Sequence, residues 1–247
     1  MPRQITVLDA LLGLVVAVGG LLFRVKYSIV IPTLNEESTL ISNLEFLLSL
    51  KDKLEAEIIV VDGQSCDKTK EIARSLTDKL YDVNPSRSLQ LNKGIMYADG
   101  EYYIFLHVDT IITDEGINSI SNINDDFRWG FFPVKLDQKS LGYSFLSFCI
   151  NLRSRLFNYC TGDQVLVIKK STFYEVNGFE EISLMEDIDI SNRLKKIFDP
   201  EILDGHAITS SRRWKKYGYL RTILLMRLIR LLFYLGVNTK ILAKIYR

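Results

Sequence analysis

The first half of the chain repeats one pattern, in which a short apolar run is followed by an amphipathic segment. The apolar runs cover residues 27–32, 57–61 and 102–107, and the segments between them keep apolar residues at helical spacing. Short apolar strands that alternate with amphipathic helices are typical of βαβ units, which build parallel sheets. We therefore expect an α/β fold with a mixed, mostly parallel sheet flanked by helices.

A polar cluster stands at the carboxyl end of each of the three expected strands. The clusters are Pro32 and Thr33 at the first strand, Asp62 and Gly63 at the second, and residues 107–109 (His-Val-Asp) at the third. Ligands of open α/β sheets bind beyond the carboxyl ends of the strands. The three polar clusters are therefore expected to meet at one crevice.

The overall composition is that of a folded protein whose net charge is close to zero. The 247 residues include 31 Lys and Arg against 30 Asp and Glu, so no global charge draws the chain to nucleic acid. The charge is uneven, however, because residues 212–247 contain no acidic side chain. Three cysteines without a CxxC pair argue against a disulfide framework or a zinc cluster and favour a reducing compartment.

The N-terminal segment, residues 1–25, has three interpretations. Residues 10–23 are all apolar or Gly, which fits a membrane anchor, an extension ahead of the domain or a signal peptide. Arg24 and Lys26 follow, so an anchor would leave the domain on the cytoplasmic side. The folded domain is expected to cover residues 26–247.

The second half of the chain mixes strands and helices differently. Its expected elements are a strand at 129–136, a helix at 140–157, a strand at 164–168, a short helix from 186 through 196 and a basic apolar helix at about 219–246. The last helix fits two descriptions. It is either a membrane-surface element or a buried helix whose Arg stems cover apolar surface.

Five motifs in a fixed order carry a family resemblance. They are SIVIPTLNEE (28–37), EIIVVDGQSCDKT (57–69), FLHVDT (105–110), TGDQ (161–164) and MEDIDISNRLKK (185–196). In this order they resemble an inverting family 2 glycosyltransferase with the Rossmann-like GT-A fold. The stretch TSSRRWKKYGYLRTILLM (209–226) is similar to a bacterial subgroup, the radical-SAM and selenodomain-associated transferase 2 type. The resemblance runs from Tyr27 to the C-terminus.

The resemblance implies a reaction. A sugar would pass from a nucleotide-diphosphate sugar, UDP- or GDP-linked, to an acceptor hydroxyl, a lipid-linked one included, with Mg²⁺ or Mn²⁺ on the diphosphate. A cytoplasmic location, at the inner face of the cell membrane if anchored, goes with it. Two alternatives stay open: a non-catalytic membrane-tethered nucleotide-binding module, and a nucleotidyltransferase, whose usual Gly-rich basic signature IPTLNEE lacks.

The resemblance also implies the nucleotide-sugar contacts. Thr33 and Glu36 would border the ribose and base, and Asp62 would contact a ring N–H of the base. Without the resemblance, Glu36 would cap a helix and Asp62 would start a turn. The full set of candidates is Pro32, Thr33, Glu36, Asp62, Arg87, Asn92, His107, Asp163, Arg213 and Trp214.

His107 and Asp109 raise the question of a metal. Mg²⁺ and Mn²⁺ prefer oxygen ligands, so Asp109 is the stronger ligand. His107 either binds the metal or donates a hydrogen bond to a phosphate or carboxylate. His206, ahead of the TSSRRW motif, is the second candidate ligand, although a lone His is more often structural.

Glu186 and Asp187 form the candidate base site. The resemblance assigns the base to Asp187, whereas acidic residues at a helix start also simply complement the helix dipole. Arg213 and Trp214 resemble the Arg-Trp part of the QxxRW motif of polysaccharide synthases. Ser210 stands where that motif has Gln, which favours a single transfer over processive synthesis.

Overall fold

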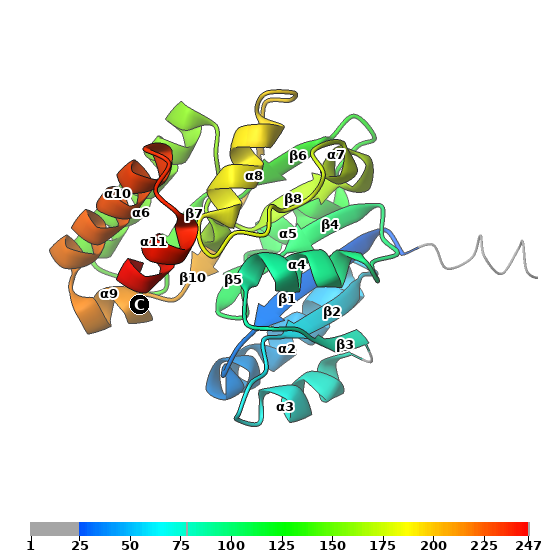
Figure 1. The fold of residues 1–247 in the computed structure, drawn as a ribbon. Coiled ribbons are helices and arrows are strands. Elements are labelled where there is room, and N and C mark those ends of the chain that lie inside the picture. The colour runs from blue at the N-terminus through cyan, green and yellow to red at the C-terminus, as the bar shows by residue number, and fades with distance from the viewer. Residues whose placement is uncertain (1–24, 78, 247) are drawn as a thin grey trace, which may run out of the picture.

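The computed structural model describes residues 25–77 and 79–246 (Figure 1). The three interpretations of the N-terminal segment concern residues 1–25, of which residues 1–24 lie outside this part. Within the described ranges, no helix combines the length and the apolar composition needed to cross a membrane.

A seven-stranded sheet forms the centre of the molecule, in the order β3-β2-β1-β4-β8-β6-β9. Its strands are β1 (Tyr27–Thr33), β2 (Glu57–Asp62), β3 (Lys79–Asp82), β4 (Tyr102–Phe105), β6 (Trp129–Phe131), β8 (Leu166–Lys169) and β9 (Glu201–Ile202). The first four are parallel, and β8 runs antiparallel to both β4 and β6. The expected mixed, mostly parallel sheet is confirmed.

Helices cover both faces of this sheet. This burial on two sides explains why the strands are apolar at successive positions. In β1, Ile29 and Ile31 pack on one side with residues of α2 (Glu37–Lys53), α3 (Thr69–Leu76) and α5 (Asp114–Ser121). Val30 points to the opposite side, toward α4 (Arg87–Ile95), α7 (Lys170–Glu175) and α8 (Glu186–Leu194). Because side chains alternate along a strand, a sheet buried on both faces requires apolar residues at every position.

Two of the expected element boundaries are wrong. The helix after β2 was expected over residues 69–80, but it ends at Leu76, where Thr77 is extended, and β3 follows at the sheet edge. The expected strand at 129–136 is two strands. Pro133, which has no N–H to donate, separates β6 from β7 (Val134–Leu136), and β7 joins a small sheet with β5 (Thr110–Ile112) and β10 (Ala207–Thr209).

The C-terminal helices gather at one end of the molecule beside α6 (Leu141–Phe157) (Figure 1). They are α9 (Arg212–Tyr217), α10 (Tyr219–Tyr234) and α11 (Thr239–Tyr246). The expected helix at about 219–246 is therefore two helices. The chain reverses at Gly236, whose φ of +79° suits a residue without a Cβ.

Candidate functional site

The ends of β1 and β2 are tied together by Asp62. Its fully buried carboxylate accepts hydrogen bonds from Thr33 Oγ1 (3.0 Å), from Ser65 N (2.6 Å) and from Ser65 Oγ (2.6 Å). Pro32 lies within β1, beside Val61 of β2. Asp62 therefore shapes the loop after β2, as the turn interpretation expects, and its contact with a base N–H stays a prediction.

Arg212 connects the first and third strand ends. Its guanidinium donates to Thr39 Oγ1 (2.9 Å) and lies 3.4 Å from Glu36 Oε2 and 3.3 Å from Asp109 Oδ2. Thr39 in turn donates to Glu36 (2.7 Å). A cavity of about 350 Å³ adjoins this cluster, lined in part by Asp109, Thr209 and Arg212. Asp109 thus faces a cavity, and its carboxylate is already paired with the guanidinium of Arg212.

His107 meets a different set of partners. Its ring nitrogens contact the Arg87 guanidinium, and Nδ1 lies 3.6 Å from Asp163 Oδ1. Asp163 follows Gly162 in a 3₁₀ turn, η1 (Gly162–Gln164), ahead of β8. A Cβ on Gly162 would lie 2.5 Å from the imidazole, so any other residue here would displace the ring of His107. The candidates Arg87, His107 and Asp163 are therefore brought together.

The same turn contacts Asp187 at the start of α8. Gly162 N donates to Asp187 Oδ2 (2.8 Å), and the backbone N of Ile188 donates to Oδ1 (2.8 Å). Met185, in the left-handed conformation with φ +71°, turns the chain so that α8 begins at Glu186. The candidate base is thus the second residue of α8, and two backbone N–H groups hold its carboxylate, one from the turn and one from α8 itself.

Glu186 differs sharply from its neighbour. Burial, followed by the charge of Asp187, raises the pKa of Glu186 to about 7, although Arg87, 3.9 Å away, opposes the rise. Two adjacent carboxyl groups therefore have different environments. Such pairs are typical of sites where one group exchanges a proton and the other carries charge.

Two arginines at this site were missed by sequence reasoning. The sequence presents Arg212 only as part of the Arg-Arg-Trp motif, and nothing in it distinguishes Arg212 from Arg213. Arg153 of α6 donates to Thr161 Oγ1 (3.4 Å), one residue from the turn that holds Asp187. Burial and the charge of Arg230 lower the pKa of Arg153. No sequence signal singles out Arg153.

Arg213 and Trp214 lie among the C-terminal helices. Arg213 donates to the backbone O of Tyr246 (2.8 Å), and its Cζ lies 3.7 Å from the centre of that ring. Trp214 packs against the cluster around Tyr143 of α6. Burial raises the pKa of Tyr246, and the charges of Arg213, Asp163, Arg87 and Asp187 act on it. Tyr246 of α11 is therefore near enough to Arg87, Asp163 and Asp187 for their charges to act on it, and Arg213 holds Tyr246 in this place.

Asn92 has a structural position. Its side-chain amide donates to Phe179 O (2.8 Å) and accepts from Phe179 N (3.1 Å). Both ends of the amide are engaged by the loop ahead of α8. One N–H and the side-chain oxygen of Asn92 therefore hold this loop, and a contact between Asn92 and a nucleotide stays a prediction.

Asp109 and His206, the two candidate metal ligands, lie apart in the structure. Strands β10 and β5 are antiparallel, with Thr209 opposite Thr110 and Ala207 opposite Ile112. His206 N donates to Thr113 Oγ1, at the far end of β5 from Asp109. Four strand residues correspond to about 13 Å, too far for one ion to bind both side chains. Within the described ranges, no three His, Cys, Asp or Glu side chains form a metal-binding group.

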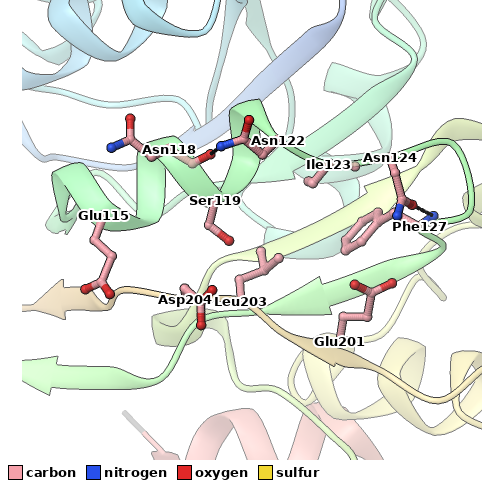
Figure 2. A pocket seen from close by; sticks show the side chains of 10 residues that line it. All are labelled: Glu115, Asn118, Ser119, Asn122, Ile123, Asn124, Phe127, Glu201, Leu203 and Asp204. Atoms are coloured by element: carbon pink, nitrogen blue, oxygen red, sulfur yellow. Dashed lines mark hydrogen bonds between the residues drawn. The ribbon is translucent and has the colours of Figure 1, made fainter.

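Two further pockets lie away from these residues. A polar pocket of about 610 Å³ lies between α5 and the segment 201–204 (Figure 2), lined among others by Glu115, Glu201 and Asp204. A second, of about 730 Å³, shares Glu115 and Asp204 with it and includes His206. Apart from His206, none of the site residues named above lines either pocket.

Comparisons with known proteins agree with this architecture. Residues 28–124 match the model of the family "Glycosyl transferase family 2". A poly-beta-1,6-N-acetyl-D-glucosamine synthase of Staphylococcus epidermidis is 29% identical over 195 residues, which are 71% of this chain and 47% of that synthase. The chain thus spans about half the length of this relative.

Two solved structures share the fold. Staphylococcus aureus TarS 1–349 in complex with UDP-GlcNAc has a TM-score of 0.53 at 18% identity, covering 75% of this chain and 58% of that one. A mannosyltransferase of Pyrobaculum calidifontis in complex with GDP-Man and Mn²⁺ has a TM-score of 0.58 at 18% identity, covering 75% and 57%. At this identity the likeness concerns the fold alone.

Proposed function

Because the chain belongs to glycosyltransferase family 2 and has the GT-A fold, we propose that it transfers a sugar from a nucleotide-diphosphate sugar to an acceptor hydroxyl, with inversion at the anomeric carbon. The observation that carries this proposal is the turn at Gly162. One residue of that turn donates to Asp187, and the next lies beside the Arg87 and His107 pair. The turn thus brings the candidate base close to the candidate phosphate-binding pair.

In this proposal the two halves of the reaction fall to different residues. Asp187 takes the proton of the acceptor hydroxyl as its oxygen attacks the anomeric carbon. The bond from that carbon to the phosphate oxygen breaks in the same step, and the nucleoside diphosphate leaves with the electron pair. The Arg87 guanidinium, 3.9 Å from Glu186, lies where it can stabilise the charge that develops on the leaving group.

The donor set fits a divalent cation held mainly by the substrate. Mg²⁺ usually keeps several waters and binds through one or two carboxylates together with substrate phosphates. Asp109 supplies one such carboxylate at the edge of a cavity and would hold the ion, which would neutralise diphosphate charge. Arg212 contacts the same carboxylate, so it would have to turn toward solvent or toward the phosphates when the ion binds.

The donor and the location extend the proposal. The TarS and mannosyltransferase structures contain UDP-GlcNAc and GDP-Man, and this supports a UDP- or GDP-linked donor. A site on the cytoplasmic face of the inner membrane, with a lipid-linked acceptor, is supported by the basic C-terminal helices.

Titration calorimetry with UDP and GDP, with and without Mn²⁺, tests the donor part. Binding of at least one nucleoside diphosphate is expected, strengthened by Mn²⁺. Asp109→Ala should remove the effect of Mn²⁺, whereas His107→Asp should keep it. Asp114→Ala, at the exposed start of α5, is the control and should change neither the affinity nor the effect of Mn²⁺. If neither diphosphate binds under any metal condition, the proposal is wrong.

A further inference from the structure

Helix α10 exposes a stripe of leucines. Five residues of the helix and its C-terminal cap are between 47% and 77% exposed: Leu220, Leu224, Leu228, Leu231 and Leu235. At 100° per residue these positions fall within an arc of about 80° on the helix surface. A regular stripe of this kind is the apolar face of an amphipathic helix, here turned outward.

The stripe is not needed to hold α10 in place. The opposite side of the helix already packs on α11 through Ile229, with Leu242 as its partner in the same cluster. Ile223 packs toward α6, and the rings of Tyr143 and Tyr219 lie 4.9 Å apart. Within residues 25–77 and 79–246, nothing covers the leucines. Large exposed apolar surfaces usually mark a binding partner.

The charge around the stripe selects the partner. Residues 212–247 hold ten Lys and Arg among 36 residues and no Asp or Glu, whereas the whole chain has a net charge of only +1. In the described part of this segment only Arg212 forms an ion pair with a carboxylate. An apolar face flanked by unpaired cations is complementary to an anionic lipid surface rather than to a second copy of itself.

A small cavity adjoins the stripe. Its volume is about 60 Å³, and its lining includes Arg213, Tyr217, Arg221, Thr222 and Tyr246. Arg221 follows Leu220 directly, so it sits about 100° around the helix, at one edge of the stripe. The two guanidiniums flank the ring of Tyr217, with Cζ 5.7 and 5.9 Å from its centre.

The cavity has the chemistry of a phosphate site. Arg213 Nε is buried and has no hydrogen-bond partner, although another nitrogen of the same group holds Tyr246 O. A buried donor without a partner is costly, and a bound acceptor oxygen would satisfy it. A cavity of about 60 Å³ exceeds the roughly 10–15 Å³ that one water molecule needs, so it leaves room for a larger polar group. Guanidinium groups bind phosphate through paired N–H donors.

We propose that this cavity binds the phosphate of an anionic lipid while the leucine stripe of α10 lies among the acyl chains. The cavity and the stripe are adjacent on one helix, as headgroup and chains are adjacent in a lipid. The inference names the membrane partner of the proposed transferase. It needs no nucleotide for its test, so its failure would leave donor binding untouched.

The two tryptophans allow a local test on the full chain. Trp129 is fully buried in the large sheet, and Trp214 lies on α9 next to Arg213. Quenching of tryptophan fluorescence by bromine-labelled acyl chains therefore reports contact at Trp214. Three kinds of phosphatidylcholine vesicle that carry these chains would be compared: without an anionic lipid, with phosphatidylglycerol, and with oleate. Oleate gives the same surface charge as phosphatidylglycerol but adds no anionic phosphate. The substitution Trp214→Phe should remove the quenching.

Strong quenching is expected only with phosphatidylglycerol. Arg221→Gln should weaken the apparent vesicle affinity about fivefold and Arg213→Gln with Arg221→Gln about 30-fold, from roughly one kcal/mol per basic residue near an anionic surface. Arg74→Gln, an exposed arginine on α3, is the matched control and should change it less than twofold. Leu220→Ser with Leu224→Ser should abolish the quenching, whereas Ile41→Ser with Leu48→Ser on α2 should not.

Several results would overturn the inference. Equal quenching of the wild type and the double arginine variant, or by oleate and phosphatidylglycerol, would mean that the cavity takes no phosphate. Inorganic phosphate that perturbs Trp214 without any quenching by lipid would indicate a free-phosphate site. A stable dimer in sedimentation that the leucine variants dissociate, with no vesicle binding, would assign the stripe to a second copy.

Discussion

Glu186 makes the stability of the protein depend on pH in a way that a single substitution removes. Burial and the neighbouring Asp187 raise the pKa of Glu186 from 4.5 to about 7 in the folded state. Between these two values the folded chain binds more protons than the unfolded chain at this group, so stability falls as the pH rises. At 1.36 kcal/mol per pKa unit the full cost is about 3 kcal/mol.

Glu186→Gln removes this cost. The variant should be more stable than the wild type by about 3 kcal/mol at pH 8, where Glu186 is ionised in both states, and by less than about 1 kcal/mol at pH 5. Urea unfolding followed by circular dichroism at both pH values measures the difference. Glu181→Gln, an exposed glutamate five residues earlier, is the control and should stay within about 0.5 kcal/mol of the wild type at both. A gain for Glu186→Gln that is equal at pH 5 and pH 8 would refute the reasoning.

Three further substitutions separate site residues from structural ones. His206→Ala should leave nucleotide affinity and its Mn²⁺ dependence within twofold in calorimetry, and a lost metal effect would contradict the register argument. Gly162→Ala should lower nucleoside diphosphate release at least tenfold, because the new Cβ would lie 2.5 Å from His107, and normal turnover would contradict this. Asn92→Ala should cost about 1–3 kcal/mol in urea unfolding because two hydrogen bonds to Phe179 are lost. A large loss of nucleotide affinity in that variant with unchanged stability would return Asn92 to the binding site.

The large sheet was predictable because its strands are buried on both faces. Ile29, Val30 and Ile31 leave no polar position, and a short unbroken apolar run of this kind is typical of a central strand covered by helices on both sides. Strand β3 was not predictable, since Lys79–Asp82 is a half-exposed edge strand without an apolar run. The break at Pro133 was visible in the sequence. The sequence does not show that the strands on its two sides belong to different sheets, because their pairing partners lie more than 30 residues away.

The site was predictable where motifs sit at strand ends and not where helical phase decides. Asp187 and Asp163 were named as candidates through the family resemblance, but the hydrogen bond from Gly162 to Asp187 joins residues 25 positions apart. Arg212 and Arg213 are adjacent and chemically identical. Only the orientation of α9 sends Arg212 to Asp109 and Arg213 to Tyr246.

The proposed function depends most on Asp187 acting as the base of a sugar transfer. The most direct measurement compares nucleoside diphosphate release from UDP- and GDP-sugars by the wild type and by Asp187→Asn, beside their nucleotide affinities. Since a positioned base contributes about 10²–10⁴-fold, we predict at least a 100-fold loss of release with affinity within threefold. Release by Asp187→Asn within a few fold of the wild type, at unchanged affinity, would contradict the account.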